Sequence, residues 1–430
     1  MHSFFKGRAQ KKTDLIIWIG ISLFSLFIFI LLIHSLGSLS LWMDEGFYYL
    51  ASQKILEYGY PLFPSGHIYY KGILYCYILA FFAFLFGMDA FVLRLVSVLS
   101  AVAVIPLIYI VSKKFFNRII GLGALVVFAL SIWVAEYSRA ALYFSPLQLL
   151  YLLNIYLFYR GYIEEKSSYK SLATILFLIS PLFHQLGMGV WFCFPAFFFM
   201  MGLKRFFKKD ILISFFLTSL FYVFIQIHEF FFWKVGYVYQ KTDFSLLGMK
   251  NYFFSNFSLN YFTEFFRSFP KMSMIIFAGL CLCFGEQLVI KKKNHRKRNS
   301  FSLGWIYLNL CLFFPLIFLG FFKTHVQPRY LYQLYPIFVM LFLAGLHKLS
   351  EIVVNFFVTP FHARKVHLFS ILSLCLFIIL LFFSAEGAGL GKIRQIVNRQ
   401  YGDPIQTDII TRSGRYKHYD HKGVGEYVRH

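Results

Sequence analysis

The sequence predicts an all-α polytopic membrane protein, and three observations carry the prediction. Hydrophobic residues make up 59% of the 430 residues, charged residues only 14%, and the mean hydropathy is +0.65, whereas a soluble domain of this length needs a more polar surface. Apolar runs of about 20 residues recur along the chain, which is the length that crosses about 30 Å of hydrocarbon. The alternating pattern of a membrane β-barrel is absent from the sequence.

The formal net charge of +23 also fits a membrane protein. Its positive residues lie mostly in short gaps between apolar runs, where they set orientation, so no nucleic-acid partner is expected. Lys6, Arg8, Lys11 and Lys12 predict a cytoplasmic N-terminus. The cysteines show no disulfide or zinc spacing, and no metal or other cofactor is supported by the pattern of histidines.

The predicted helices follow from the apolar runs and the basic gaps between them. The first, near Leu15–Leu36, leaves the cytoplasm, and the next basic gap is Lys113–Arg118. That order requires an odd number of crossings between them, although two apolar stretches lie there, Ile73–Gly87 and Phe91–Val111. The stretch 73–87 has about 15 residues, so we expect it to lie along the outer leaflet and the second stretch to cross.

Nine further helices complete a predicted total of about eleven. They are expected at Ile119–Glu136, Pro146–Tyr159, Leu172–Phe183, Gly187–Gly202, Ile211–Phe232, Met272–Ile290, Leu303–Phe322, Tyr330–His347 and Val366–Ser384. The cytoplasmic gaps of this map hold 23 Lys and Arg residues against about 11 in the external loops, as the positive-inside rule requires. Letting residues 73–87 cross would invert every later basic loop.

The map divides the chain into a cytoplasmic segment 1–14, a module 15–160 with a first outer loop 37–90, further helices over 161–384 with an outer loop 233–270, and a tail 385–430 placed outside. Every cytoplasmic gap is short, and no Gly-rich phosphate loop occurs, so no nucleotide site is expected. Polar residues other than Lys and Arg gather in the outer loops, which predicts an outward-facing active site.

An adjacent acidic pair, Asp44-Glu45, follows the first helix, in a chain with only 19 acidic residues. Two interpretations are open. The pair either solvates the loop and caps the amphipathic stretch that follows, or supplies a carboxylate that acts as general base on an acceptor hydroxyl. Trp42 and Tyr48 would hold the segment at the membrane interface. In the catalytic interpretation Asp44 is the base and Glu45 orients the loop.

Three outer cations are candidates for binding a lipid phosphate: Lys71, Arg139 and Arg329. Each has an alternative. Lys71 would snorkel at the interface, Arg139 would pair with Glu136 within one helix, and Arg329 would anchor the helix that it precedes.

Further candidates on the outer side complete the set. Arg94 lies just inside the outer end of the second crossing helix, where it either snorkels or pairs with an acid of the first loop. His325 belongs to the last outer cluster, with Arg329, and His184 at the end of the fifth helix is a weaker candidate.

With these residues in place, the chain resembles the GT-C superfamily of polyprenyl-phosphate-sugar glycosyltransferases, especially the branch of protein O-mannosyltransferases and the lipid A aminoarabinose transferase. The resemblance is carried by WMDEGFYYLASQKILEYG, YYKGILYCYILAFFAFLFGMDAFVLRLVSVLSA, KKFFNRIIGLGALVVFALS, YSRAALYFSPLQLLYLL and, later, QPRYLYQLYP. It implies a GT-C fold with juxtamembrane helices in the first outer loop, Asp44 as catalytic base and Lys71 near the lipid phosphate. The family often has Lys-Pro-Pro-Leu where this chain has Lys-Gly-Ile-Leu at 71–74.

The implied reaction moves a sugar from a polyprenyl-phosphate donor to an acceptor hydroxyl at the outer face, with inversion, while Lys71, Arg139 and Arg329 stabilise the leaving phosphate. The implied partners are that donor, a glycolipid, glycan or protein acceptor, and the lipid bilayer of a bacterial cytoplasmic membrane. Two alternatives remain: a transporter or flippase of lipid-linked saccharides, which would need charges near the bilayer midplane, and a non-catalytic subunit of an envelope complex.

Overall fold

The computed structural model describes residues 2–63, 66, 68–70, 72–233, 263, 272–279, 281–282, 300–319, 328–358 and 390–398. Their elements are α1 (His2–Ile33), α2 (Met43–Tyr58), α3 (Ile73–Phe86), α4 (Ala90–Phe115), α5 (Arg118–Ala129), α6 (Ile132–Ser138), α7 (Phe144–Phe158), η1 (Tyr159–Ile163), α8 (Ser167–Phe183), η2 (Gln185–Phe192), α9 (Cys193–Met201), α10 (Leu203–Phe206), α11 (Lys209–Trp233), α15 (Ser300–Leu319), η3 (Pro328–Leu334), α16 (Tyr335–Val358) and α18 (Leu390–Val397). All are helical, which confirms the predicted all-α class.

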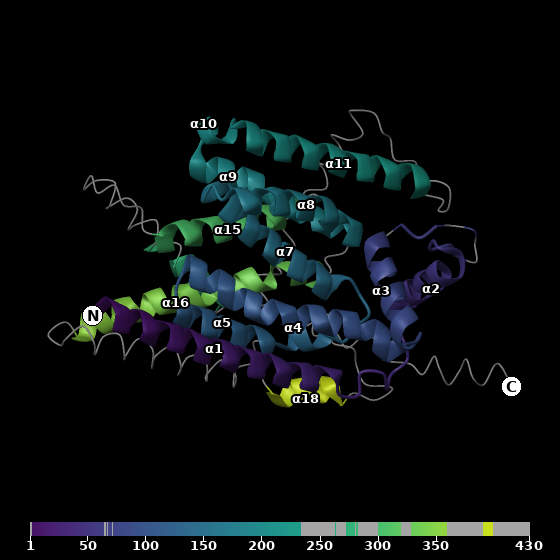
Figure 1. The fold of residues 1–430 in the computed structure, drawn as a ribbon, viewed down its shortest axis with the longest axis horizontal. Coiled ribbons are helices and arrows are strands. Elements are labelled where there is room, and N and C mark those ends of the chain that lie inside the picture. The colour runs from purple at the N-terminus through teal and green to yellow at the C-terminus, as the bar shows by residue number, and fades with distance from the viewer. Residues whose placement is uncertain are drawn as a thin grey trace.

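The long helices lie side by side in one bundle, with α1 and α11 on opposite sides of it (Figure 1). Among the described residues, four helices are long and apolar enough to cross a membrane: Lys12–Ile33, Ala90–Phe115, Lys209–Ile227 and Arg329–Ile352. In the most apolar part of the last helix 94% of the residues are buried, whereas in that of the first only 17% are. The bundle therefore has a packed centre, and its outer helices turn apolar side chains outward, as a lipid surrounding requires.

The predicted number of about eleven crossing helices is not confirmed. Besides the four long helices, the described chain has shorter apolar helices at Ile73–Phe86, Arg118–Ala129, Ser167–Phe183, Gln185–Met201 and Leu303–Leu319. The helix predicted at Val366–Ser384 lies outside the described residues, and of Met272–Ile290 only 272–279 and 281–282 are described.

Several predicted helices are interrupted, and one interruption shapes the site. The stretch predicted as a single helix over Ile119–Glu136 forms α5 and α6, because Ser131 has an extended backbone and its Oγ accepts a hydrogen bond from the Trp133 N–H at 3.2 Å. A serine placed in this way caps a new helix. Two other predicted helices begin with a 3-10 segment, because η2 precedes α9 and η3 precedes α16.

Helices α2 and α3 lie beyond one end of the bundle, here named the α2 end, with α3 turned across the direction of the long helices (Figure 1). Helix α3 has 14 residues and is about 21 Å long, shorter than the hydrocarbon core. Gly72 precedes it with φ 66°, and a Cβ at this position would lie 2.5 Å from the Phe183 carbonyl oxygen. A proline has a Cβ and a φ near −65°, so the Pro-Pro turn of the resembling family does not fit here.

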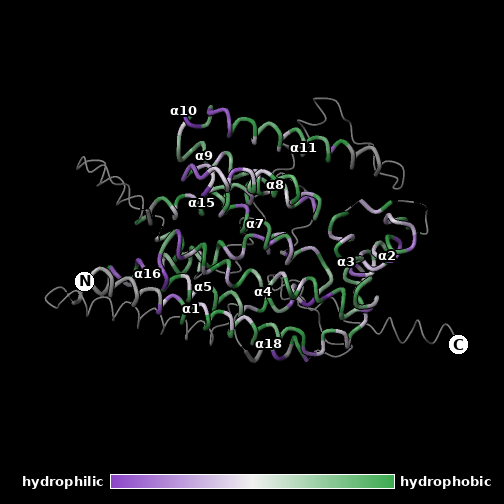
Figure 2. Tube along the Cα trace, in the orientation of Figure 1, coloured by the Kyte–Doolittle hydropathy of each residue, from purple (hydrophilic) through white to green (hydrophobic). Residues whose placement is uncertain are grey.

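Charged residues gather at the opposite end of the bundle. Asp14 of α1 pairs with Lys113 at 3.3 Å and with Arg118 at 3.0 Å, and Lys208 pairs with Glu165 at 2.8 Å. Hydrophobic residues fill the lengths of the helices, and hydrophilic ones lie at their ends, for example at α10 and in α2 (Figure 2). The described residues thus form an apolar slab with two polar ends.

Candidate active site

A cavity of about 60 Å³ lies at the α2 end, between the segment that follows α1 and the helices α2, α4, α6 and η3. Its volume is enough for about four water molecules. Five predicted site residues line it: Glu45, Arg94, Glu136, Arg139 and Arg329. Three guanidinium groups thus face two carboxylates, so the lining carries a net positive charge.

Asp44 lies in the first turn of α2 and pairs with Arg329 of η3. The Arg329 Nη1 donates to the Asp44 Oδ2 at 2.7 Å, and the side chains of Arg329 and Asp44 are 20% and 29% exposed. The guanidinium also lies over the Trp42 and Tyr330 rings, 5.8 and 5.7 Å from their centroids. A carboxylate and a cation that are far apart in the sequence therefore meet beside the cavity.

Glu45 has a different environment from its neighbour. Its carboxylate accepts two hydrogen bonds from Arg94, from Nε and Nη2, each at 2.8 Å, and one from each of the Trp42 and Ala141 N–H groups at 2.7 Å. The side chain is 2% exposed. Of the two alternatives for Arg94, pairing with an acid of the first loop is the one observed.

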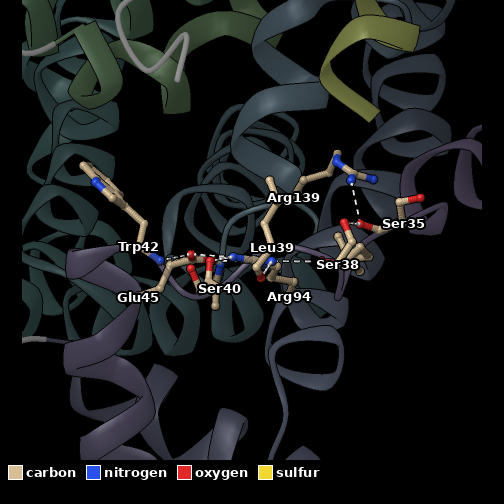
Figure 3. A network of polar contacts seen from close by, with 10 residues as sticks. Ser35, Ser38, Leu39, Ser40, Trp42, Glu45, Arg94 and Arg139 are labelled. Carbon is tan, nitrogen blue, oxygen red and sulfur yellow. Dashed lines mark hydrogen bonds and ion pairs between the residues drawn. The ribbon is translucent and has the colours of Figure 1, made fainter. Parts of the chain in front are cut away.

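Arg94 extends this network to the segment that follows α1 (Figure 3). Its Nη1 donates to the carbonyl oxygens of Leu36 and Leu39, and its Nη2 to that of Ser40, each at 2.9 Å. The pair therefore ties together this segment, the starts of α2 and α4, and the loop between α6 and α7. Burial would raise the pKa of Glu45, but the Arg94 charge and the hydrogen bonds hold it below its ordinary value.

Arg139 uses its guanidinium on backbone carbonyls, and Figure 3 shows it turned toward the segment that follows α1. Its Nη1 donates to Leu32 O at 2.6 Å and His34 O at 2.7 Å, and its Nη2 to Ser35 O at 3.2 Å and Val397 O at 3.3 Å. A cation at a helix C-terminus satisfies carbonyls that have no partner within the helix. Arg139 thus joins the ends of α1 and α18.

An aromatic cluster forms the wall next to Asp44. The Tyr48 ring lies 5.6, 5.2 and 6.2 Å from the rings of Tyr69, Tyr75 and Tyr143, and the Tyr143 ring stacks on His184 at 3.8 Å. Tyr48, predicted at the membrane interface, is 3% exposed. Burial raises the pKa of Tyr48, Tyr69 and Tyr143, so these hydroxyls remain protonated and can donate hydrogen bonds at neutral pH.

Two residues at the site were not predicted from the sequence. Gln148 of α7 donates from Nε2 to the Tyr332 carbonyl at 2.6 Å and thereby holds η3, which carries Arg329. A glutamine within an apolar run was the only signal for it. Ile396 of α18 contributes to the cavity wall, and Ile393, Ile396 and Val397 are buried, a pattern readable in the tail as apolar positions on one helix face.

Three further candidates from the sequence are Glu136, Lys71 and His325. Glu136 is 7% exposed and lines the cavity, whereas Lys71 and His325 lie outside the described residues. Among the residues that the structure describes, no group of three or more His, Cys, Asp or Glu side chains could hold a metal ion.

Comparisons with known proteins agree with this fold. Residues 70–230 match the sequence model of the dolichyl-phosphate-mannose-protein mannosyltransferase family. No curated protein sequence matches the chain. The structure of ArnT from Cupriavidus metallidurans bound to undecaprenyl phosphate is similar, with a TM-score of 0.55 and 13% identity over 92% of this chain and 75% of that chain.

Two further structures are similar at the same level. ArnT from Cupriavidus metallidurans in the apo state gives a TM-score of 0.52 and 11% identity over 93% of this chain and 75% of that chain. Archaeal oligosaccharyltransferase AglB from Archaeoglobus fulgidus, in complex with an inhibitory peptide and a dolichol-phosphate, gives 0.53 and 12% over 87% of this chain and 55% of that chain. The chain therefore has the fold of these structures, as the predicted resemblance to the GT-C superfamily implied, and its residues 70–230 match the sequence model of a mannosyltransferase family.

Proposed function

We propose that this chain transfers a sugar from a polyprenyl phosphate to an acceptor hydroxyl, with Asp44 as the general base. The observation that carries the proposal is the Asp44–Arg329 pair at 2.7 Å, beside a cavity lined by three arginines. A half-exposed carboxylate can take a proton, and fixed cations next to it can stabilise a phosphate that gains charge.

In the proposed reaction the acceptor O–H gives its proton to an Asp44 carboxylate oxygen. The acceptor oxygen attacks the anomeric carbon from the side opposite to the phosphate, and the bond from that carbon to the phosphate oxygen breaks. The bond's electron pair leaves with the phosphate, so direct displacement inverts the anomeric centre. Arg329 would stabilise the departing charge, and Lys71 is proposed as a second cation.

The remaining site residues take positioning roles in this proposal. Glu45 and Arg94 fix the start of α2, and therefore the place of Asp44. Arg139 holds the ends of α1 and α18 through carbonyl contacts, so we assign its effect on the donor to the shape of the cavity and to its charge.

The donor class has support from the relatives. The printed descriptions of the similar structures name undecaprenyl phosphate for ArnT and a dolichol-phosphate for AglB, both of which are polyprenyl phosphates. A polyprenyl-phosphate donor also suits a site at one polar end of an integral membrane bundle, because the lipid tail stays in the bilayer while its head group reaches the cavity.

The proposed orientation places the α2 end outside the cytoplasm of a bacterial cell. Its support is the basic character of the other end, where Lys113, Arg118 and Lys208 lie. In intact cells, a cysteine at Lys113 should resist an impermeant thiol reagent, and one at the exposed Ser38 should react. Labelling at position 113 would contradict this orientation.

The proposed chemistry is tested with purified protein in nanodiscs, a synthetic polyprenyl-phosphate sugar and a hydroxyl acceptor. Asp44→Asn keeps the size of the side chain and removes the base, so turnover should fall by about 10²-fold or more. Asp89→Asn is the matched control, because Asp89 caps α4 at the same end and its asparagine keeps that bond to the Val92 N–H. Near-full transfer by Asp44→Asn, or retention of the anomeric configuration in the product, would refute the mechanism.

A further inference from the structure

We infer that Arg329 is handed from Asp44 to the lipid phosphate during transfer, so that one guanidinium serves both the base and the leaving group. The inference rests on the proposed function and adds a coupling between its two halves. Its starting point is that Asp44, the proposed base, is in contact with a cation that also lines the cavity.

Arg329 is placed to donate hydrogen bonds both to Asp44 and to a lipid phosphate in the cavity. The Arg329 Nη1 is engaged with Asp44 at 2.7 Å, and the rings of Trp42 and Tyr330 flank the guanidinium. The guanidinium therefore lies against two rings, and it both bonds to Asp44 of α2 and lines the cavity. A small rotation of the side chain is enough to exchange a carboxylate for a phosphate, since both accept the same N–H geometry.

The charges change in opposite directions at these two partners. Before transfer, Asp44 carries one negative charge, and the donor, a phosphodiester, carries another. After transfer, Asp44 has taken the acceptor proton and is neutral, whereas the released phosphate monoester carries close to two negative charges at neutral pH. The total is conserved, and the negative charge has moved from one side of Arg329 to the other.

This shift of negative charge from Asp44 to the phosphate favours the handover of Arg329 as the glycosidic bond breaks. While Asp44 is charged it competes with the phosphate for Arg329, and once it is protonated it no longer does. Proton transfer to Asp44 therefore frees a cation for the phosphate as the glycosidic bond breaks, and stabilisation is concentrated in the transition state. Among the described residues, the titratable and charged groups that interact with Asp44 from other parts of the chain are Arg329, Tyr69 and Tyr143, of which Arg329 carries a charge at neutral pH.

The inference predicts that a neutral residue at position 44 improves binding of the product lipid. Asp44→Asn mimics the protonated aspartate, so in nanodiscs it should bind undecaprenyl phosphate about three- to tenfold more tightly than the wild type, the range expected for releasing a half-buried ion pair. Binding of the methyl diester of undecaprenyl phosphate, which has one charge fewer, should improve less. Asp89→Asn should leave both affinities unchanged.

The same Asp44→Asn substitution made in a protein that also carries Arg329→Gln distinguishes handover from simple repulsion between Asp44 and the phosphate. In Arg329→Gln, which by itself should weaken binding, the gain from Asp44→Asn should shrink to about twofold or less, because no cation remains to be released. An equal gain in both backgrounds, or no gain in the first, would overturn the handover while leaving the proposed transferase intact. Failure of the wild type to bind either lipid would overturn the proposed function itself.

Discussion

The Glu45–Arg94 pair gives the most quantitative prediction for the architecture of the site. Glu45→Gln removes one charge of a pair whose side chains are 2% and 4% exposed. It also replaces one carboxylate oxygen by an NH2 group, so either the Trp42 N–H, which bonds to Oε2, or the Ala141 N–H, which bonds to Oε1, loses its acceptor. Removing one partner of a buried pair costs about 3–5 kcal/mol. Three carbonyl oxygens still accept from Arg94, so we expect the lower end, about 3 kcal/mol.

Equilibrium unfolding in mixed micelles, followed by tryptophan fluorescence, measures this loss. The matched control is Glu57→Gln in the same helix, because Glu57 pairs with Lys54 at a side-chain exposure of 36%, where an ion pair contributes about 0–1 kcal/mol. If the two variants lost the same stability within about 0.5 kcal/mol, the network would not anchor α2, and the reasoning from burial would be wrong.

Three further predictions follow from the same contacts. The pKa of Glu45 is lowered in the folded state, so its contribution to stability is fully present above its ordinary value of 4.5 and is lost as pH falls below it. The difference in stability between the wild type and Glu45→Gln should therefore be constant from pH 5 upward and shrink in acid. A constant difference down to about pH 3 would contradict this. Gln148→Leu removes the hydrogen bond that holds η3, so it should raise the KM for the donor about tenfold and lower the stability by roughly 1–2 kcal/mol. An unchanged KM would show that Arg329 is placed by other contacts. Arg139→Ala removes the bond to Val397 O, so limited proteolysis should cleave within α18 faster than in the wild type, and Arg139→Lys should restore protection in part. Equal cleavage rates would refute the anchoring role.

Much of the fold could be predicted because hydrophobicity dominates a membrane chain. The run predicted at Phe91–Val111 corresponds to α4 within a few residues, and the run predicted at Leu15–Leu36 overlaps most of α1, which begins earlier, at His2, and ends at Ile33. The breaks inside helices were harder to foresee. Ser131 reads as an ordinary residue within an apolar run, and only its contact with the Trp133 N–H makes it a cap. A local sequence pattern is compatible with several backbone conformations, and the packing of the folded chain decides which of them forms.

The site was predictable in its residue types, but of its pairings only that of Arg94 with an acid of the first loop was among the alternatives that the sequence offered. Asp44, Arg94, Arg139 and Arg329 were all singled out by scarcity of charge on the proposed outer side. Their partners depend on tertiary contacts that span 49 residues for Arg94 and Glu45 and 285 for Arg329 and Asp44. Arg139 shows the limit most clearly, because nothing in its sequence context distinguishes a phosphate ligand from a cap for carbonyl groups.

The different environments of Asp44 and Glu45 follow from helix geometry. Consecutive residues of an α-helix point about 100° apart, so two adjacent acids in the first turn of α2 cannot face the same neighbour. Glu45 turns toward α4, where four N–H groups saturate its carboxylate in a buried setting. Asp44 turns toward η3, where it keeps 29% exposure. A saturated, buried carboxylate holds structure, whereas one that keeps solvent contact beside a cation can exchange a proton. An adjacent acidic pair at this point in the chain therefore provides two functions, an anchor and a proposed base, because the helix separates their directions.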